Sequence, residues 1–211
     1  MSDAPLDFIH RFVPAHGAAK DAPTLLLLHG TGGDENDLLS LGPMLAPKAA
    51  LLSPRGKVSE QGMARFFRRL AEGVFDENDI RKRSAELAAF VAQAATFYDF
   101  DPKRVVAVGF SNGAITAASL MLLHPDTLAG AILSHAMIPL VPETLPDLRG
   151  RPVLLTTGQS DMIVPASESE RLAKLLERAG AEVTLDRQPG GHALTRAEIE
   201  MGAGWLRAHG W

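Results

Sequence analysis

Residues 104–123 read RVVAVGFSNGAITAASLMLL, and their pattern changes at Ser111. Arg104–Val108 is rich in β-branched residues, which predicts a buried strand. Asn112–Leu123 is small or apolar almost all round, which predicts a buried helix that ends at His124-Pro125. A serine between two glycines at such a sharp turn presents its side chain at the end of a sheet, as a nucleophile must. The alternative is a tight turn that merely favours small residues.

Similar apolar runs recur along the chain, with helical patterns between them. Further strands are predicted at Leu6–Val13, Thr24–Leu28, Ala49–Ser53, Ala131–Leu133, Val153–Thr157 and Glu182–Arg187. Further helices are predicted at Ile80–Phe97 with Asp79 as N-cap, at Ser167–Arg178, and at Thr195–Ala208 with Thr195 and Glu198 as a capping box. Alternating strands and helices predict one α/β domain over residues 1–211, with a mostly parallel sheet flanked by helices.

The composition narrows the classes of function. The chain has 211 residues, enough for one sizeable core, and 46% of them are hydrophobic. No run approaches the length of a membrane span, and no signal peptide is recognised, so we expect a cytoplasmic protein without membrane insertion. The net charge of −4 comes from interspersed charges of both signs, which disfavours a nucleic-acid partner. The absence of cysteine excludes disulfides, thiolate zinc sites and a cysteine nucleophile.

A serine hydroxyl needs a base, and His192 is the best-placed histidine. It follows the predicted strand Glu182–Arg187 through Gln-Pro-Gly-Gly, in a loop at the carboxyl edge of the sheet. His135, just past another strand end, is a competitor at the same edge. The histidines that are less well placed are His10, His16, His124 and His209.

The base in turn needs a carboxylate that holds its tautomer, and Asp161 is the candidate. It follows the strand Val153–Thr157 directly, whereas Asp147 lies in a proline-rich loop and Asp186 lies inside a strand. A turn-forming or helix-capping aspartate is the alternative interpretation. The chain order of serine, aspartate and histidine is the order found in α/β-hydrolases.

An oxyanion hole requires two backbone N–H groups near the nucleophile. One is predicted at Asn112, directly after Ser111, and the other at Thr31 in the glycine-rich loop 29–33. That loop lacks the Gly-Lys-Ser/Thr and G-x-G-x-x-G patterns, so nucleotide binding is disfavoured. We expect no cofactor and no metal.

Six motifs together resemble the phospholipase/carboxylesterase branch of the α/β-hydrolases, which includes acyl-protein thioesterases and small bacterial carboxylesterases. They are LLLLHGTGGDENDLL (25–39), SPRG (53–56), RFF (65–67), DPKRVVAVGFSNGA (101–114), TGQSDMIVP (157–165) and GGHAL (190–194). The resemblance implies a single-domain α/β-hydrolase fold, with Ser111, Asp161 and His192 as the triad and Thr31 and Asn112 as oxyanion donors. It also allows a homodimer.

The substrate is less well defined by the sequence. Asn112 and Ala114 stand where acyl-protein thioesterases usually show Gln and Gly, and Phe66 stands where many members carry Trp. Little chain is left for a lid, which favours small, soluble carboxylic esters. A thioesterase, an acyl-protein thioesterase or lysophospholipase, and a catalytically silent binding protein are the alternatives. Predicted pocket residues are Arg55, Phe66, Phe67, Ile138, Leu140, Met162 and Val164.

Overall fold

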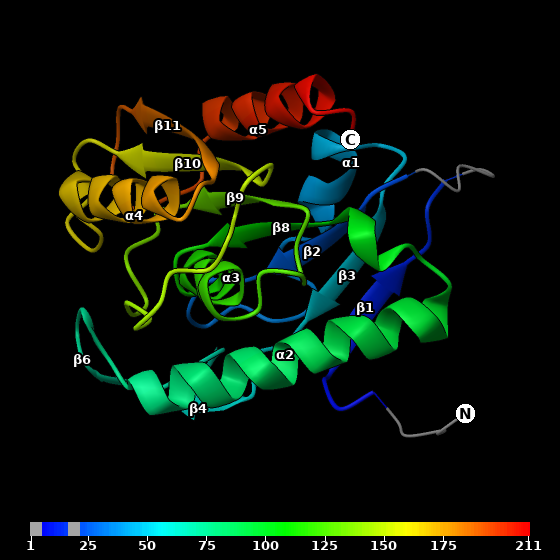
Figure 1. Ribbon diagram of the computed structural model, residues 1–211, viewed down its shortest axis with the longest axis horizontal. Helices are drawn as coiled ribbons and strands as arrows, with labels where there is room; N and C mark the ends of the chain where they lie inside the picture. The colour runs from blue at the N-terminus through cyan, green and yellow to red at the C-terminus, as the bar shows by residue number, and fades with distance from the viewer. Residues whose placement is uncertain (1–5, 17–21) are drawn as a thin grey trace.

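A seven-stranded sheet runs through the centre of the molecule in the computed structural model, which describes residues 6–16 and 22–211 (Figure 1). The strands are β1 (His10–Val13), β2 (Thr24–Leu28), β3 (Ala50–Pro54), β8 (Val105–Phe110), β9 (Gly130–Ser134), β10 (Pro152–Gly158) and β11 (Glu182–Gln188). Their spatial order is β1-β3-β2-β8-β9-β10-β11. Only the edge strand β1 is antiparallel to its neighbour, so the predicted, mostly parallel sheet is confirmed.

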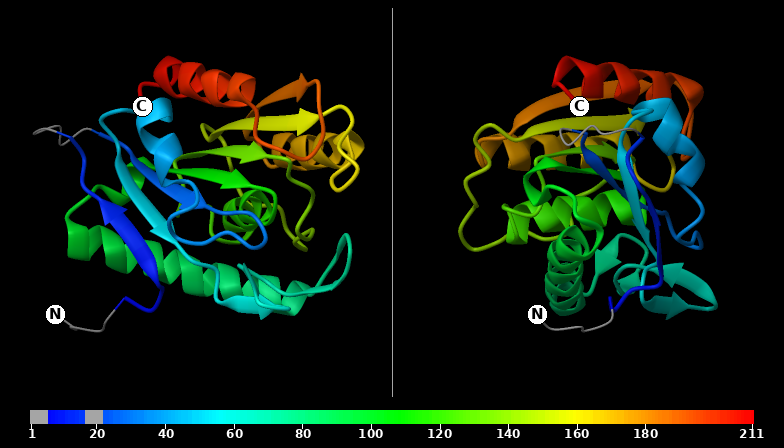
Figure 2. Two further views of the ribbon diagram at one scale, coloured as in Figure 1. Left: turned by 180° about the vertical axis from the view of Figure 1, so that it is seen from behind. Right: turned by 90° about the vertical axis from the view of Figure 1, so that its right-hand side faces the viewer.

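Helices cover both faces of this sheet, and each face has its own apolar cluster. The helices are α1 (Gly42–Leu45), α2 (Glu77–Tyr98), α3 (Asn112–Leu123), α4 (Ala166–Arg178) and α5 (Arg196–Ala208). Helices α2, α3 and α4 contribute to one cluster, and α1 and α5 to the other (Figure 2). In β2, Leu26 and Leu28 face the first cluster while Leu25 and Leu27 face the second. The apolar run is continuous because a parallel strand is buried on both faces.

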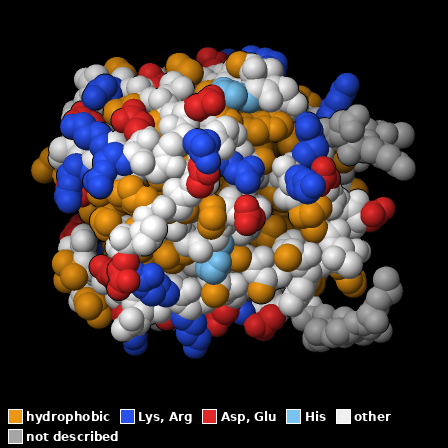
Figure 3. Space-filling model, in the orientation of Figure 1, with side chains coloured by type: hydrophobic (Ala, Val, Ile, Leu, Met, Phe, Trp, Pro, Cys, Tyr) orange, Lys and Arg blue, Asp and Glu red, His pale blue; other side chains and the backbone are white. Residues whose placement is uncertain are grey.

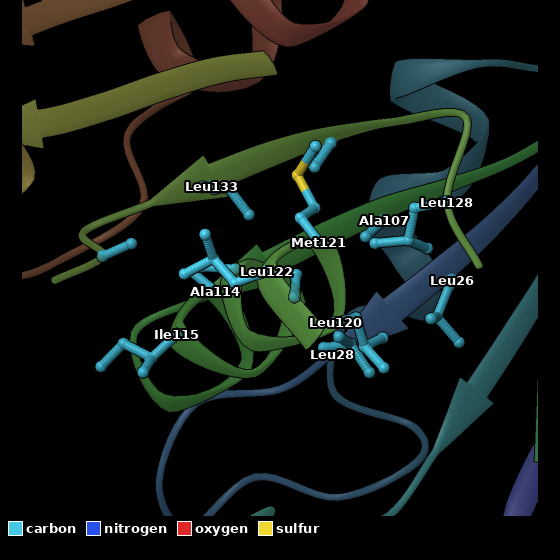
Figure 4. Packing of buried hydrophobic residues seen from close by; sticks show 14 of the residues in the cluster. Leu26, Leu28, Ala107, Ala114, Ile115, Leu120, Met121, Leu122, Leu128 and Leu133 are labelled. Carbon is cyan, nitrogen blue, oxygen red and sulfur yellow. The ribbon is translucent and has the colours of Figure 1, made fainter. Parts of the chain in front are cut away.

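Helix α3 is the most deeply buried helix, as its composition predicts. Eleven of its twelve residues are buried, and its side chains pack against β2, β8 and β9 (Figure 4). It also lies against α2, where the hydroxyls of Ser84 and Ser119 form a hydrogen bond of 2.7 Å. Small residues let the helices and strands approach closely, and this packing holds the amino end of α3 at one fixed point on the sheet edge.

The amino end of α2 differs from the sequence prediction. The N-cap is Asp76, whose carboxylate accepts the N–H of Asp79 at 3.1 Å, so the helix begins at Glu77. The carboxylate of Asp79 instead accepts the N–H of Arg68 at 2.7 Å. In α5 the predicted capping box of Thr195 and Glu198 is confirmed. The predicted N-cap at Asp79 is therefore wrong, and α2 begins three residues before the predicted start at Ile80.

Two parts of the chain were not predicted as regular structure. The segment after β3 forms two small hairpins, β4 (Val58–Glu60) with β5 (Met63–Arg65) and β6 (Arg69–Ala71) with β7 (Val74–Phe75). A 3-10 turn, η1 (Leu39–Leu41), precedes α1, and another, η2 (Pro102–Arg104), precedes β8. These elements have two or three residues each, too few for a periodic signal. The first strand is also shorter than predicted, because Leu6–Ile9 lie outside it.

The connections at the carboxyl edge carry no inserted domain within residues 22–211. The link from β9 to β10 is a loop without a helix, and the hairpins after β3 are short. This agrees with the expectation of a minimal lid. None of the helices described by the structure combines the length and apolar character that a membrane span needs.

Candidate active site

Ser111 occupies a strained turn between β8 and α3. Its φ is 52° and its ψ −117°, a region that non-glycine residues rarely adopt. A Cβ on Gly109 would lie 2.6 Å from the backbone of Ala114, and one on Gly113 would lie 2.0 Å from the carbonyl oxygen of Leu28. Both glycines are therefore required by the close approach of backbone. The strain and the missing side chains are those of a nucleophile elbow.

Ser111, His192 and Asp161 lie in one chain of hydrogen bonds at the carboxyl edge of the sheet. His192 Nε2 is 2.9 Å from Ser111 Oγ, and His192 Nδ1 is 2.7 Å from Asp161 Oδ2. The carboxylate can only accept, so Nδ1 carries the proton and Nε2 is free to accept the serine hydroxyl. The arrangement can remove the proton of Ser111 as its oxygen attacks.

Asp161 is buried and is held ionised by four hydrogen-bond donors. Its Oδ1 accepts the N–H groups of Ile163 and Val164 at 2.8 and 2.9 Å, and Oδ2 accepts from His192 and His135. Burial raises the pKa of this carboxyl, but the Val164 N–H, the two imidazoles and the Ile163 N–H lower it by more. The pKa therefore lies below its usual value.

His135, the competing histidine, does not face Ser111. Its Nδ1 lies 2.7 Å from Asp161 Oδ2, and its Nε2 lies 3.1 Å from Glu198 Oε1. The ring is 1% exposed and stands edge-on to His192, with 5.2 Å between ring centroids. The sequence placed His135 at the right edge, but its two carboxylate partners were missed because they come from later elements.

The loop that carries Thr31 is held by a buried histidine. His29 Nδ1 is 2.7 Å from the carbonyl oxygen of Gly30, and Nε2 accepts the N–H of Gly56 at 3.0 Å. Burial lowers the pKa of His29 most strongly, which favours the neutral ring. A turn closed by Gly33 N–H on Gly30 O at 3.1 Å then sets the path of the backbone through Thr31.

Strand β5 braces the same loop from the other side. The N–H of Gly32 donates to Ala64 O at 2.9 Å, and Arg65 Nη1 donates to Thr31 Oγ1 at 2.7 Å. The Arg65 side chain is 4% exposed and lies 3.2 Å from Glu60 Oε2. No sequence signal predicted this brace, because β5 is too short to recognise.

Asn112 begins α3 beside Ser111. Its N–H belongs to the first turn of a helix, where no intrahelical acceptor exists. Its side-chain Oδ1 accepts the N–H of Phe66 at 2.8 Å, while the buried Nδ2 has no partner among the described residues. The side chain therefore ties α3 to the segment after β5, a role that the sequence did not reveal.

The predicted pocket residues fall into different environments. The buried ones are Phe66, Phe67, Leu140 and Val164. Phe67 packs edge-on against Phe75 at 5.1 Å within the core, and Met162 is 90% exposed. The hydrogen bonds of Ile163 and Val164 to Asp161 keep that turn at the surface, which leaves Met162 in solvent.

Two of the predicted pocket residues line an open hollow, and another forms an ion pair. Ile138 and Leu140 line an open hollow of about 400 Å³ together with Val74 and Phe75. Arg55 donates to Glu35 Oε1 at 3.0 Å and lies 3.7 Å from Asp34, so its charge is already paired.

One group of side chains has a spacing that a cation could use. Ligand atoms of His135, Asp161 and His192 lie within 4.8 Å of one another. Each imidazole Nδ1 already donates to the same carboxylate oxygen, and a metal would need both nitrogens free of their protons. The hydrogen-bonded arrangement accounts for these residues as they stand.

A parallel sheet with a strained serine at a strand-to-helix turn, followed along the chain by aspartate and histidine, defines the α/β-hydrolase class. Within that class the chain belongs to the phospholipase/carboxylesterase family, which it matches over residues 11–209. It is an enzyme of the carboxylesterase-type serine hydrolases.

Individual relatives agree with this membership. The chain is 50% identical over 183 residues to MhqD of Bacillus subtilis (strain 168), a protein assigned to the hydrolases, covering 87% of this chain and 92% of that one. The crystal structure of the Bacillus cereus carboxylesterase superposes with a TM-score of 0.93 at 45% identity, over 96% of this chain and 94% of that one. An acyl-protein thioesterase 1 of Gibberella zeae is 32% identical over 115 residues, 50% of this chain and 48% of that one.

Proposed function

We propose that Ser111, His192 and Asp161 are the catalytic triad of an esterase that acts through an acyl-enzyme. The observation that carries the proposal is the 2.9 Å contact between His192 Nε2 and Ser111 Oγ, with Nδ1 oriented by Asp161. Ser111 Oγ attacks the ester carbonyl carbon while its proton passes to Nε2. The tetrahedral intermediate collapses, and the alcohol leaves with that proton. Water then attacks the acyl-enzyme by the same route and frees Ser111.

The backbone N–H groups of Thr31 and Asn112 are proposed to hold the oxyanion of each tetrahedral intermediate. The Asn112 N–H is supported by its place in the first turn of α3, whose positive dipole end also favours an anion. The Thr31 N–H is supported by the rigid loop around it, which His29 and Arg65 hold from two sides. Donors that are already fixed need no reorganisation when the charge develops.

The substrate class is proposed to be small carboxylic esters with short to medium acyl or aryl groups. The connections at the carboxyl edge carry no inserted domain within residues 22–211, and the hollow beside the β9–β10 loop is lined in part by the apolar side chains of Ile138 and Leu140. Thioesters are the second candidate, favoured by the match to an acyl-protein thioesterase over about half of the chain.

The proposed ligand is that small ester substrate, and no nucleic-acid partner is proposed. Figure 3 draws one face, on which acidic and basic side chains are interspersed among apolar ones without a continuous field of either sign. A continuous basic face is what nucleic-acid binding needs. A cytoplasmic location, the extent of one domain over residues 1–211 and a homodimer remain predictions. Cell fractionation, limited proteolysis and light scattering test them in turn.

Two measurements test the proposed function. A fluorophosphonate probe should label Ser111 in the wild type and leave Ser111→Ala unlabelled, whereas an unlabelled, folded wild type would indicate a binding protein. A panel of p-nitrophenyl esters and matching thioesters from acetyl to decanoyl then defines the substrate. We expect the highest kcat/KM for short oxygen esters. A preference for long thioesters would assign the enzyme to the thioesterases instead.

A further inference from the structure

His135 is a buried histidine for which the proposed reaction has no use. It follows β9 directly, and its ring lies between two carboxylates from different elements, Asp161 after β10 and Glu198 in α5. All three side chains are 1% exposed or less. Charged groups at this depth persist only when they are paired, so the three must be understood as one unit.

The positions of its two ring nitrogens indicate the protonation state of His135. Nδ1 is 2.7 Å from Asp161 Oδ2, and Nε2 is 3.1 Å from Glu198 Oε1. The second contact is an ion pair whose direction departs from that of a straight hydrogen bond. A neutral imidazole has only one N–H and would turn a lone pair toward one of the carboxylates. Only the imidazolium, with two N–H groups, satisfies both neighbours.

Glu198 is fixed in place as an anion. Its Oε1 accepts the hydroxyl of Thr156 at 2.7 Å, and its Oε2 accepts the N–H of Thr195 at 2.8 Å and the hydroxyl of Thr195 at 2.9 Å. Burial raises the pKa of this carboxyl, but the hydrogen bonds from His135 and the threonine donors lower it by more, so that the pKa is about 2. The same side chain completes the capping box of α5, so one helix end is built around the partner of His135.

The backbone at His135, like that at Ser111, has a positive φ. Its φ is 56°, and only four non-glycine residues in the described part of the chain have a positive φ. The position is held by the His135 N–H, which donates to Thr156 O at 2.8 Å. A positive φ at a non-glycine residue is unfavourable and persists where the surroundings over-determine it. Here it directs the ring from the end of β9 toward Asp161.

We propose that His135 is a positioning residue held as a cation between Asp161 and Glu198, which fixes Asp161 as the orienter of His192 and extends activity toward lower pH. The inference rests on the proposed triad. Asp161 Oδ2 receives two N–H groups at 2.7 Å, one from each imidazole, so His135 and His192 act on the same oxygen. A positive charge beside His192 opposes the protonation that would remove the base.

The charged and titratable groups that face the two rings are few. Around His135 the contacts are Asp161 and Glu198, with His192 at 5.2 Å between ring centroids. Around His192 they are Asp161, His135 and the Ser111 hydroxyl, with the uncharged ring of Phe110 at 5.2 Å. The cation is thus the only positive charge among these contacts, and two anions remain when it is removed.

The first test is the pH profile of kcat/KM for p-nitrophenyl acetate in three variants. His135→Gln keeps an N–H donor and removes the charge. His135→Gln with Glu198→Gln also removes the buried anion, and Gln at this position can still close the capping box. His124→Gln is the matched control, since His124 ends α3 away from the site.

We expect the midpoint of the acid limb to rise by about 0.6–2.4 pH units in His135→Gln, the shift due to a unit charge about 5 Å away at effective dielectrics of 80 to 20. The double variant should move in the same direction by less, and His124→Gln should not move. An active His135→Gln or double variant with an unchanged or lowered midpoint would overturn the proposal. A wild type without turnover or probe labelling would instead overturn the proposed triad.

The second test needs no variant to fold. A ¹⁵N–¹H correlation spectrum of the imidazole side chains of wild-type protein at pH 7.5 should contain one ring with both nitrogens protonated, protected from solvent exchange. If every ring were singly protonated at that pH, His135 would be neutral and the proposal would fail. Where His135→Gln folds, loss of that signal assigns it.

Discussion

Phe66 donates its backbone N–H to the side-chain Oδ1 of Asn112 at 2.8 Å, within the buried region behind the candidate nucleophile. The bond joins the segment after β5 to the first residue of α3. Asn112→Ala should break it without removing the Asn112 N–H. Loss of a buried hydrogen bond costs about 1–3 kcal/mol when a donor is left unpaired, so the free energy of unfolding should fall by that amount.

The same substitution should lower kcat/KM by about tenfold, because the segment that it frees continues directly from β5, the strand that braces the Thr31 loop. Chemical denaturation and steady-state kinetics measure the two effects. Ala114→Gly, which restores the residue usual in thioesterases without touching this bond, is a suitable comparison. Wild-type stability in Asn112→Ala would mean that the bond contributes nothing.

Removal of the Asp161 charge should slow the chemical step without changing the shape of the site. In Asp161→Asn the amide can donate to His192 Nδ1. The His192 ring would then carry its proton on Nε2, and this nitrogen could not accept the hydroxyl of Ser111. A loss of about 10⁴ in kcat is typical of that exchange in a serine protease. Burst kinetics should show slower acylation. A decrease of less than tenfold would contradict the assignment of Asp161.

The contact of Arg65 with Thr31 should influence the transition state more than substrate binding. Thr31→Val keeps the shape of the side chain but removes the hydroxyl that accepts Arg65 Nη1 at 2.7 Å. A loosened Thr31 N–H should lower kcat by about 10–10³-fold, with KM nearly constant, since full loss of an oxyanion donor costs 10²–10³. A change confined to KM would place Thr31 in ground-state binding instead.

Stability should fall on the acid side as Glu198 takes up a proton. The folded-state pKa of Glu198 is about 2, below the ordinary value of 4.5. A lowered folded pKa gives stability that is present above pH 4.5 and is lost as the pH falls toward 2. Thermal unfolding between pH 7 and pH 2 should show this loss in the wild type, and Glu198→Gln should lack that component.

The contribution of His135 to stability should change with pH in the opposite direction to that of Glu198. Burial lowers its pKa, but the carboxylates of Glu198 and Asp161 raise it by more, so the folded pKa lies above 6.5. Its contribution is complete below pH 6.5 and is lost as the pH rises through the folded pKa. His135→Gln should therefore show a flatter decline of Tm above pH 6.5 than the wild type. An identical decline would mean that His135 is neutral.

Activity should survive metal removal. The ligand atoms of His135, Asp161 and His192 are close enough to share a cation, but the proposed reaction uses His192 as a base with a free Nε2. Dialysis against EDTA should leave kcat/KM unchanged, and added Zn²⁺ should inhibit by competing for the imidazoles. Activity that EDTA abolishes and Zn²⁺ restores would assign a metal-dependent reaction.

Local pattern alone was sufficient to predict the strands of the main sheet, the four long helices and the three residues of the candidate triad. Buried parallel strands are continuous apolar runs. Ser111 and Asp161 come after two such strands, β8 and β10, and His192 comes after the half-exposed strand β11. Carboxyl ends of parallel strands meet at one edge, so chain position was enough to bring the residues together.

Only the tertiary structure decided which groups support the candidate triad and the Thr31 loop. His135 meets Glu198, which lies 63 positions further along the chain, because α5 packs on the face of the sheet to which β9 contributes. Arg65 reaches Thr31, and Asn112 reaches Phe66, through hairpins too short to carry a pattern. Such contacts depend on strand register, backbone strain and the close packing of distant elements, and none of these is encoded in the periodicity of a local segment.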